Sequence, residues 1–93
     1  MRTIERSSVF KRDFKREVKG QHRNTLEKDL VHVITLLVND RELPAKYRDH
    51  ALSGDWVGYR ECHVKPDLLL IYKVTDPEML RLARLGSHSE LNL

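Results

Sequence analysis

Cysteine is almost absent from this sequence of 93 residues, in which Cys62 is the only one. A single thiol excludes an internal disulfide framework and any paired Cys-x-x-Cys zinc site, and it is compatible with a reducing compartment. The sequence also lacks an apolar run near the roughly 18 residues of a transmembrane helix. Its first residues, Met-Arg-Thr-Ile-Glu-Arg-Ser-Ser, lack the apolar segment of a secretory signal. We therefore expect no membrane contact and a location in the cytoplasm.

Internal repeats and low-complexity segments are missing as well. A length of 93 residues predicts one domain, spanning residues 1–93, with one modest core. Hydrophobic residues make up 40% of the chain and charged residues 33%, which is typical of a soluble globular protein rather than a disordered one. Any functional site must therefore be a shallow groove on the surface.

Charge is unevenly distributed along the chain. Residues 1–25 contain eight Lys or Arg and three acidic residues, a net charge of +5, whereas the remaining residues sum to −2. Five of these basic residues fall in one candidate helix: Lys11, Arg12, Lys15, Arg16 and Lys19. A basic stripe suits a phosphate-rich partner, although an ordinary solvated helix face has the same composition.

The first residues predict a short strand followed by a helix. Thr3–Arg6 is the candidate strand, and Ser7 or Ser8 can cap the helix that follows it. That helix should end near Gly20. Its predicted apolar stripe recurs every four residues and consists of Phe10, Phe14 and Val18.

A second helix shows the clearest periodicity in the chain. Its apolar residues form one wide face: Leu26, Leu30, Val33, Ile34, Leu37 and Val38. Asn24 can cap its start, with Glu27 at the capping-box position, and the helix should end near Asn39 or Asp40. Two amphipathic helices joined by a short loop predict a helical hairpin that must cover an apolar surface.

The second half of the chain predicts strands. Residues 41–55 read as a loop, and residues 57–64 alternate loosely, with Glu61 and His63 on one face of the strand and Cys62 on the other. Residues 68–74 form a near-continuous apolar run, typical of a central strand buried on both faces. Residues 79–85 give the last strand, and the short turns favour antiparallel neighbours. We therefore predict an α+β domain, with the hairpin packed on a small, mostly antiparallel sheet.

Four titratable residues in loops and at strand ends are candidates for catalysis: His50, His63, Asp67 and His88. Strand geometry can bring His63 and Asp67 within about 10 Å, because they flank one tight turn. Imidazoles and a carboxylate suit acid–base chemistry on an RNA phosphodiester, whose 2′-hydroxyl is the nucleophile. Histidine titrates near neutral pH, so two imidazoles can act as base and acid without a metal. Three basic side chains nearby in the sequence are candidates to bind the phosphate: Arg60, Lys65 and Arg84.

Other interpretations of these residues stay open. Histidines with a carboxylate can bind zinc or iron, although the spacing matches no recognised ligand motif such as His-Glu-x-x-His. The histidines could instead cap loops or lie in a tail. Cys62, inside a strand with no base fixed beside it, is better explained as a small buried side chain than as a nucleophile. Trp56 could stack on a base but is more simply explained as an anchor of the core.

The same residues occur in a pattern of highly specific spacing. It begins at residues 49–67 with Asp-His-Ala-Leu-x-Gly-x-Trp-x-Gly-Tyr-Arg-x-x-His-Val-x-Pro-Asp. It continues at residues 69–73 with Leu-Leu-Ile-Tyr-Lys and ends at residues 84–88 with Arg-Leu-Gly-Ser-His. This pattern closely resembles the YafQ branch of the RelE/ParE superfamily, the toxins of bacterial type II toxin–antitoxin pairs. The resemblance covers nearly the whole chain.

What the resemblance implies is a metal-independent mRNA interferase that cleaves mRNA in the ribosomal A site. It implies a β-α-α-β-β-β fold with a curved sheet, and a catalytic set of His50, His63, Asp67 and His88. Asp67 or His50 would be the base and His88 the acid, with Arg84 contacting phosphate. The expected partners are the 70S ribosome, which the basic first helix would grip through its RNA, mRNA, and an antitoxin of the DinJ or RelB type. No cofactor is expected.

One position departs from the family pattern. Family members commonly carry an aromatic residue four positions after the last histidine, where this chain has Asn92. Loss of that stacking surface would cost about 1–3 kcal/mol of base contact. Two other functions stay open: a ParE-type gyrase inhibitor, although such chains generally lack the clustered histidines, and a nucleic-acid-binding module without activity.

Overall fold

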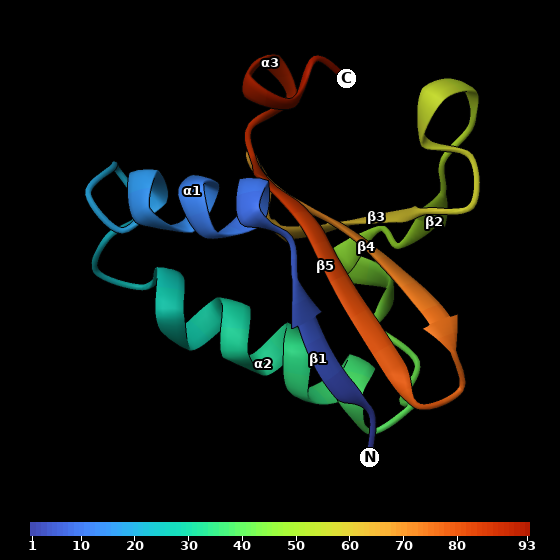
Figure 1. Ribbon diagram of the computed structural model, residues 1–93. Helices are drawn as coiled ribbons and strands as arrows, with labels where there is room; N and C mark the ends of the chain where they lie inside the picture. The colour runs from blue at the N-terminus through green and yellow to red at the C-terminus, as the bar shows by residue number, and fades with distance from the viewer.

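A five-stranded sheet with two long helices forms the fold (Figure 1). The computed structural model describes residues 1–93. Its elements are β1 (Thr3–Arg6), α1 (Ser8–Glu17), α2 (Leu26–Val38), β2 (His50–Ala51), β3 (Arg60–Lys65), β4 (Leu68–Asp76), β5 (Met79–Gly86) and α3 (His88–Leu91). Two short 3-10 turns, η1 (Ala45–Tyr47) and η2 (Gly54–Trp56), flank β2. None of the helices has the length and apolar character needed to cross a membrane.

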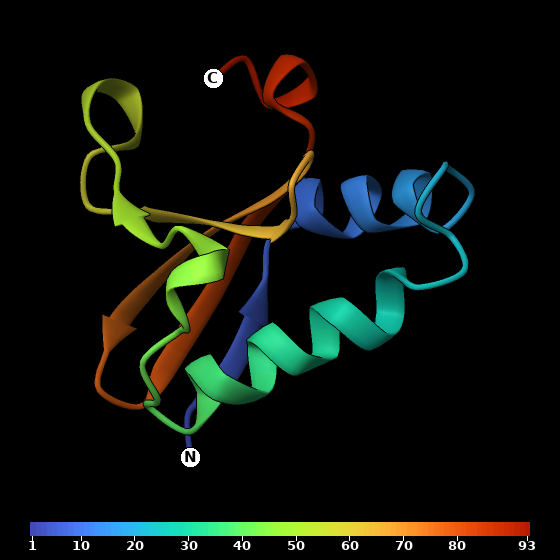
Figure 2. The same cartoon turned by 180° about the vertical axis from the view of Figure 1, so that it is seen from behind.

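The sheet has the strand order β1-β5-β4-β3-β2, with β1 parallel to β5 and every other pair antiparallel. The central strand β4 is buried on both faces, as its apolar run predicts. Leu68 and Leu70 pack in the main core with α2, whereas Leu69 and Ile71 join a smaller cluster with Leu91 of α3. Both views show α2 on one side of the sheet and α3 on the other (Figures 1 and 2). The α+β prediction is confirmed.

Helix α1 begins as predicted but buries a different face. The Ser7 hydroxyl caps it by accepting a hydrogen bond from the N–H of Phe10 at 2.9 Å. The prediction that Val18 lies on the apolar stripe is wrong, because Val18 is the C-cap residue and is 37% exposed. The helix ends at Glu17, short of Gly20. Its buried side chains include Asp13 and Glu17, two acids that both pair with Arg16 of the same helix.

Helix α2 matches its predicted apolar face and its predicted end at Asn39. The prediction that Asn24 caps it is wrong. Thr25 is the N-cap residue and makes no side-chain cap hydrogen bond. The preceding turns explain this, because the His22 carbonyl accepts the N–H of Leu26 at 2.8 Å. The two helices diverge from the loop that joins them, so the predicted hairpin is open rather than tightly paired (Figure 1).

Four short elements escaped the sequence prediction: β2, α3 and the two 3-10 turns η1 and η2. Strand β2 lies within the predicted loop 41–55, and it pairs His50 and Ala51 with Glu61 and Arg60 of β3. Two residues are too few to show a strand pattern. Residues 54–59 form η2 and a turn, so β3 begins three residues later than predicted. Helix α3 carries a capping box between Ser87 and Glu90, a sequence signal that would have revealed it.

One buried carboxylate joins α1 to the last strand. Asp13 is 2% exposed and accepts hydrogen bonds from the Leu85 N–H at 3.0 Å and from Nε of Arg84 at 2.8 Å. Arg16 donates to the same carboxylate at 3.1 Å and to the Leu85 carbonyl at 2.9 Å. Arg16 also lies 3.0 Å from the Glu90 carboxylate of α3. Helix α1, strand β5 and helix α3 are therefore connected by a single polar cluster.

The variant Asp13→Ala should lose about 3 kcal/mol of unfolding free energy at neutral pH, since removing one partner of a buried pair leaves the others uncompensated. Burial raises the pKa of Asp13, but hydrogen bonds from Arg84 and Leu85 outweigh it, so the pKa lies below the ordinary 3.8. The stabilisation should therefore be complete above the ordinary pKa and be lost as the pH falls through the lowered value. Urea denaturation of the variant and of the exposed control Asp55→Ala measures the difference. Equal midpoints at neutral pH would contradict this role.

Candidate functional site

Three histidines meet around one carboxylate on the α3 side of the sheet. The rings of His63 and His88 lie with their centroids 5.6 Å apart and their planes inclined by 61°. Glu61 Oε1 lies 3.4 Å from Nε2 of His63 and 3.7 Å from Nε2 of His50. We call Glu61, His50, His63 and His88 the histidine cluster. It draws side chains from β2, β3 and α3, and from positions up to 38 residues apart in sequence.

Strand pairing explains why His50 and His63 share this site. His50 is the direct partner of Glu61 across the β2–β3 pair, and His63 follows Glu61 by two residues on the same face of β3. The Arg48 carbonyl lies 2.8 Å from Nδ1 of His50. A carbonyl can only accept, so Nδ1 carries the proton, and Nε2 of the neutral ring is left as an acceptor. The free nitrogen therefore faces Glu61.

His88 is held by the turn that begins α3. Ser87 caps this turn, and its hydroxyl accepts the Glu90 N–H while the Glu90 carboxylate accepts the Ser87 N–H at 2.9 Å. Glu90 is also held by Arg16, so α1 fixes α3 from the side. Gly86 permits this close approach: a Cβ at that position would lie 2.9 Å from an Arg16 nitrogen and 3.2 Å from Leu91.

Glu61 is the residue that sequence reasoning missed. Its side chain is only 5% exposed, and its two ion-pair partners are both candidate catalytic histidines. The predicted alternation had already put Glu61 and His63 on one face of the strand. That shared face was the available signal, because an acid and a histidine at i and i+2 of a strand are neighbours.

Asp67 lies in different surroundings from the histidine cluster. Its carboxylate accepts a hydrogen bond from Gln21 at 2.9 Å and lies 3.0 Å from Nε2 of His22. Both partners belong to the loop between α1 and α2. No hydrogen bond or ion pair joins Asp67 to His50, His63 or His88. Its contribution to catalysis stays a prediction that would require a change of partners.

The three predicted phosphate-binding cations have acidic partners within the chain. Nε of Arg84 lies 2.8 Å from Asp13, and Nε of Arg60 lies 3.2 Å from Asp49. Lys65 bonds to Asp29 of α2 and to the Thr25 hydroxyl. The hydrogen bond from Lys65 is the main reason why the pKa of Asp29 is lowered. These cations can bind a phosphate only by sharing their present partners or leaving them.

The basic residues of α1 differ in availability. Lys11, Arg12, Lys15 and Lys19 are exposed and make no ion pair. Arg16 is instead used inside the molecule, with Asp13, Glu17, Glu90 and the Leu85 carbonyl as partners. Four of the five predicted ribosomal RNA contacts are therefore free to meet a polyanion.

The surroundings of Cys62 and Trp56 indicate that these side chains serve packing. Cys62 is fully buried in the main core, and burial, aided by the charges of Asp49 and Glu61, raises the pKa of its thiol to about 12. A thiol of that pKa stays protonated, which agrees with the prediction of a small buried side chain. Trp56 packs against the smaller cluster and meets Tyr59 edge to face, with centroids 5.3 Å apart. That contact favours the core interpretation of Trp56.

Glu61, His63 and His88 also form a possible metal-binding set. One ligand atom from each lies within 4.8 Å of the others. Two imidazoles with a carboxylate are suitable donors for zinc or copper. Bond lengths near 2.0–2.2 Å would require these atoms to move closer together, and the exposed His88 on its short helix can provide that movement. The donor set therefore fits a metal.

Comparison with known proteins gives matches over nearly the full chain. A family described as "Bacterial toxin of type II toxin-antitoxin system, YafQ" matches residues 2–93. The mRNA interferase toxin YafQ of Escherichia coli (strain K12) is 45% identical over 91 residues, which cover 97% of this chain and 95% of that protein. A copper-bound mutant toxin from Helicobacter pylori has a TM-score of 0.86 at 39% identity, covering 98% of this chain and 99% of that one. The YafQ chain of the E. coli DinJ–YafQ complex has a TM-score of 0.81 at 44% identity, covering 98% of both chains.

The buried thiol leads to a simple expectation. In the folded protein, Cys62 should react with a disulfide reagent such as DTNB at least about 10³-fold more slowly than in the urea-unfolded chain. The raised pKa depletes the reactive thiolate, and burial keeps the reagent away from the sulfur. Absorbance at mildly alkaline pH follows the reaction. Rapid modification of the folded protein would instead indicate an accessible and activated cysteine.

Proposed function

This chain belongs to the YafQ family of bacterial type II toxins, and we propose that it is an mRNA interferase that cleaves mRNA in the ribosomal A site by metal-independent acid–base catalysis. The observation that carries the proposal is the meeting of three imidazoles around Glu61. RNA supplies its own nucleophile, so an enzyme needs a base, an acid and charge stabilisation. The histidine cluster contains candidates for the first two.

His50 is the best candidate for the base. Its Nδ1–H is committed to the Arg48 carbonyl, which leaves Nε2 to take the proton of the 2′-hydroxyl. The 2′-oxygen then attacks the adjacent phosphorus. Glu61 stabilises the imidazolium that forms, because its carboxylate lies 3.7 Å away. We therefore favour His50 over Asp67, whose carboxylate is occupied by Gln21 and His22.

His88 is the best candidate for the acid. It is exposed at the start of α3, and its ring packs against the ring of His63. Protonated His88 would give its proton to the departing 5′-oxygen as the P–O bond breaks. The products are a 2′,3′-cyclic phosphate and a 5′-hydroxyl. The His63 side chain, which is 12% exposed, lies between Glu61 and His88 and would hold these two side chains in position. Arg84 would steady the phosphate from its partly exposed position beside Asp13.

A bound metal is the alternative for the same residues. Glu61, His63 and His88 would hold it, and it would supply Lewis-acid stabilisation of the phosphate charge. A similar toxin from H. pylori is copper-bound. Metal coordination would occupy nitrogen lone pairs of His63 and His88. The acid–base mechanism instead needs a ring nitrogen of His88 to carry a proton, so one nitrogen cannot serve both mechanisms.

An antitoxin partner is part of the proposal. E. coli YafQ forms a complex with DinJ, and we propose that a small antitoxin of this kind binds this chain. An apolar groove between α1 and α2, lined by Phe10, Phe14 and Val31, fits an amphipathic segment. Lys11 and Lys15 line the same groove. An acidic partner bound there would cover cations that we assign to the ribosome, which gives a direct physical means of inhibition.

Primer extension on a defined mRNA in stalled ribosomes tests the function. We expect cleavage at the A-site codon that persists in EDTA. His50→Ala and His88→Ala should each lower the rate by about 10²–10⁴-fold, the usual contribution of a general base or acid. His32→Ala, which alters an exposed histidine on α2, is the matched control and should cleave normally.

Three other results would change the conclusion. Loss of cleavage in EDTA with recovery on adding zinc or copper would establish the metal mechanism. Growth arrest without cleavage would favour the gyrase-inhibitor alternative. Growth arrest that survives His50→Ala and His88→Ala together would indicate a binding protein without catalysis.

Ribosome binding should depend steeply on salt. Each lost phosphate contact lowers the slope of log affinity against log salt by about 0.7–0.9. Lys11→Gln combined with Lys15→Gln should therefore reduce the slope by about 1.5. Arg41→Gln serves as the control, because this exposed arginine lies outside α1 and makes no ion pair. Binding titrations at several salt concentrations measure the slopes, and an unchanged slope in the double variant would remove α1 from the interface.

A further inference from the structure

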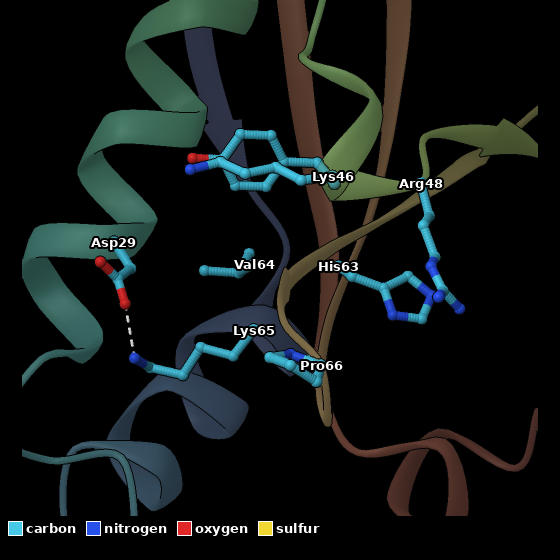
Figure 3. Close-up of a pocket in the computed structure, with 8 residues that line it drawn as sticks. Asp29, Lys46, Arg48, His63, Val64, Lys65 and Pro66 are labelled. Carbon is cyan, nitrogen blue, oxygen red and sulfur yellow. Dashed lines mark hydrogen bonds and ion pairs between the residues drawn. The ribbon is translucent and has the colours of Figure 1, made fainter.

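A basic cavity of about 410 Å³ adjoins the histidine cluster. It opens between turn η1, helix α2 and the end of β3, and we call it the η1 cavity. Its charged lining consists of Lys46, Arg48, Lys65 and Asp29, and His63 lines it as well. Figure 3 shows Arg48 and His63 at one side of the cavity, with Lys65 and Asp29 joined at the other.

The cavity carries uncompensated positive charge. Its one carboxylate, Asp29, has a lowered pKa and is bound by Lys65, so these two charges offset each other. Lys46 lies over the Tyr47 ring, 5.1 Å from its centroid, and makes no ion pair. The exposed guanidinium group of Arg48 makes neither a hydrogen bond nor an ion pair. Two cations therefore remain available at the surface of one concave site.

The backbone holds Arg48 in a conformation that such a residue seldom adopts. Its φ angle is 50°, in the left-handed region, where a long side chain is uncommon. Two hydrogen bonds fix it: its N–H donates to the Ala45 carbonyl at 3.0 Å, and its carbonyl accepts Nδ1–H of His50 at 2.8 Å. Strained residues of this kind concentrate at binding and catalytic sites. The same residue thus orients His50 and presents a free guanidinium beside His63.

Beyond Glu61, turn η1 rather than another strand lies beside the outer edge of β3. β2 pairs only with Arg60 and Glu61, so the outer edge of β3 from Cys62 to Lys65 has no strand partner. His63 lies in this part of the strand and lines the cavity. The η1 cavity and the histidine cluster are therefore continuous through the side chain of His63.

We propose that the η1 cavity is a second phosphate subsite, which binds the RNA phosphate next to the scissile one through Arg48 and Lys46. The proposal rests on the ribonuclease function proposed above. A guanidinium group suits a phosphate because it can donate two parallel hydrogen bonds to its oxygens. His63 borders both sites, so a strand seated in the cavity places its next phosphate at the catalytic imidazoles. The subsite sets position and affinity, and it takes no part in proton transfer.

A binding titration tests the subsite without any ribosome. The probe is a trinucleotide made non-cleavable by 2′-O-methyl groups, followed by ¹H–¹⁵N NMR of the full chain. We expect shift changes at residues 46–48 and 63–65, and at least about 10-fold weaker binding in Arg48→Gln and in Lys46→Gln. Arg41→Gln, an exposed loop arginine without side-chain partners, is the control. Shifts confined to α1, or equal affinities for all variants, would overturn the proposal.

Kinetics on ribosomes separate binding from positioning. Arg48→Gln keeps the carbonyl that orients His50, so it should raise KM about 10-fold and leave kcat within about 2-fold. A fall in kcat with unchanged KM would mean that the Arg48 side chain serves the chemical step and not binding, and the subsite would be rejected. If the wild type binds the trinucleotide as expected but does not cleave mRNA, the subsite stands and the proposed function fails.

Discussion

The carboxylate of Asp13 is the interaction on which the rest of the arrangement depends. It is buried between α1 and β5, where it binds a backbone N–H and two guanidinium groups. A buried charge is tolerated only when it is paired and hydrogen-bonded, so these partners are obligatory rather than incidental. Because Arg16 also reaches Glu90, the same cluster determines where α3 lies. The position of His88 is thus set from the opposite end of the chain.

This arrangement places structural and chemical demands on the same side chains. Arg84 holds Asp13 and is also the residue assigned to the phosphate, with 25% of its side chain exposed. Arg16 interrupts an otherwise free basic stripe because it serves the interior. Lys65 ties β3 to α2 while its neighbours at the η1 cavity remain unpaired. In a chain of 93 residues, few polar groups are available for one task only.

Much of the fold could be predicted from local patterns. The apolar run of β4 and the single face of α2 identify the central strand and the helix that covers it, because burial on a regular element repeats with that element's period. The face of α1 could not be found in this way. Asp13 is buried through partners 71 and 72 residues away, and no local period records such pairs. Strand β2, only two residues long, is likewise defined by its partner.

The candidate site, like the fold, could be predicted only in part from the sequence. His50, His63 and His88 were predicted from residue type and spacing, and the structure brings them together. Glu61 was overlooked because carboxylates are common on strand surfaces, and only the β2–β3 register places it against two imidazoles. Asp67 was predicted from the turn that it shares with His63. The structure turns its side chain toward the loop of residues 21–22 instead, where two donors are available.

The two-sided burial of β4 has a consequence for how sequence variation in this protein would be interpreted. Leu68, Leu70 and Tyr72 support the helices, whereas Leu69 and Ile71 lie in the cluster beneath α3. Neighbouring residues of one strand therefore support different parts of the molecule, the first set the helix α2 and the second the segment that carries His88. In a deep mutational scan that selects for harmless but soluble toxins, tolerated changes along β4 should recur at every second residue.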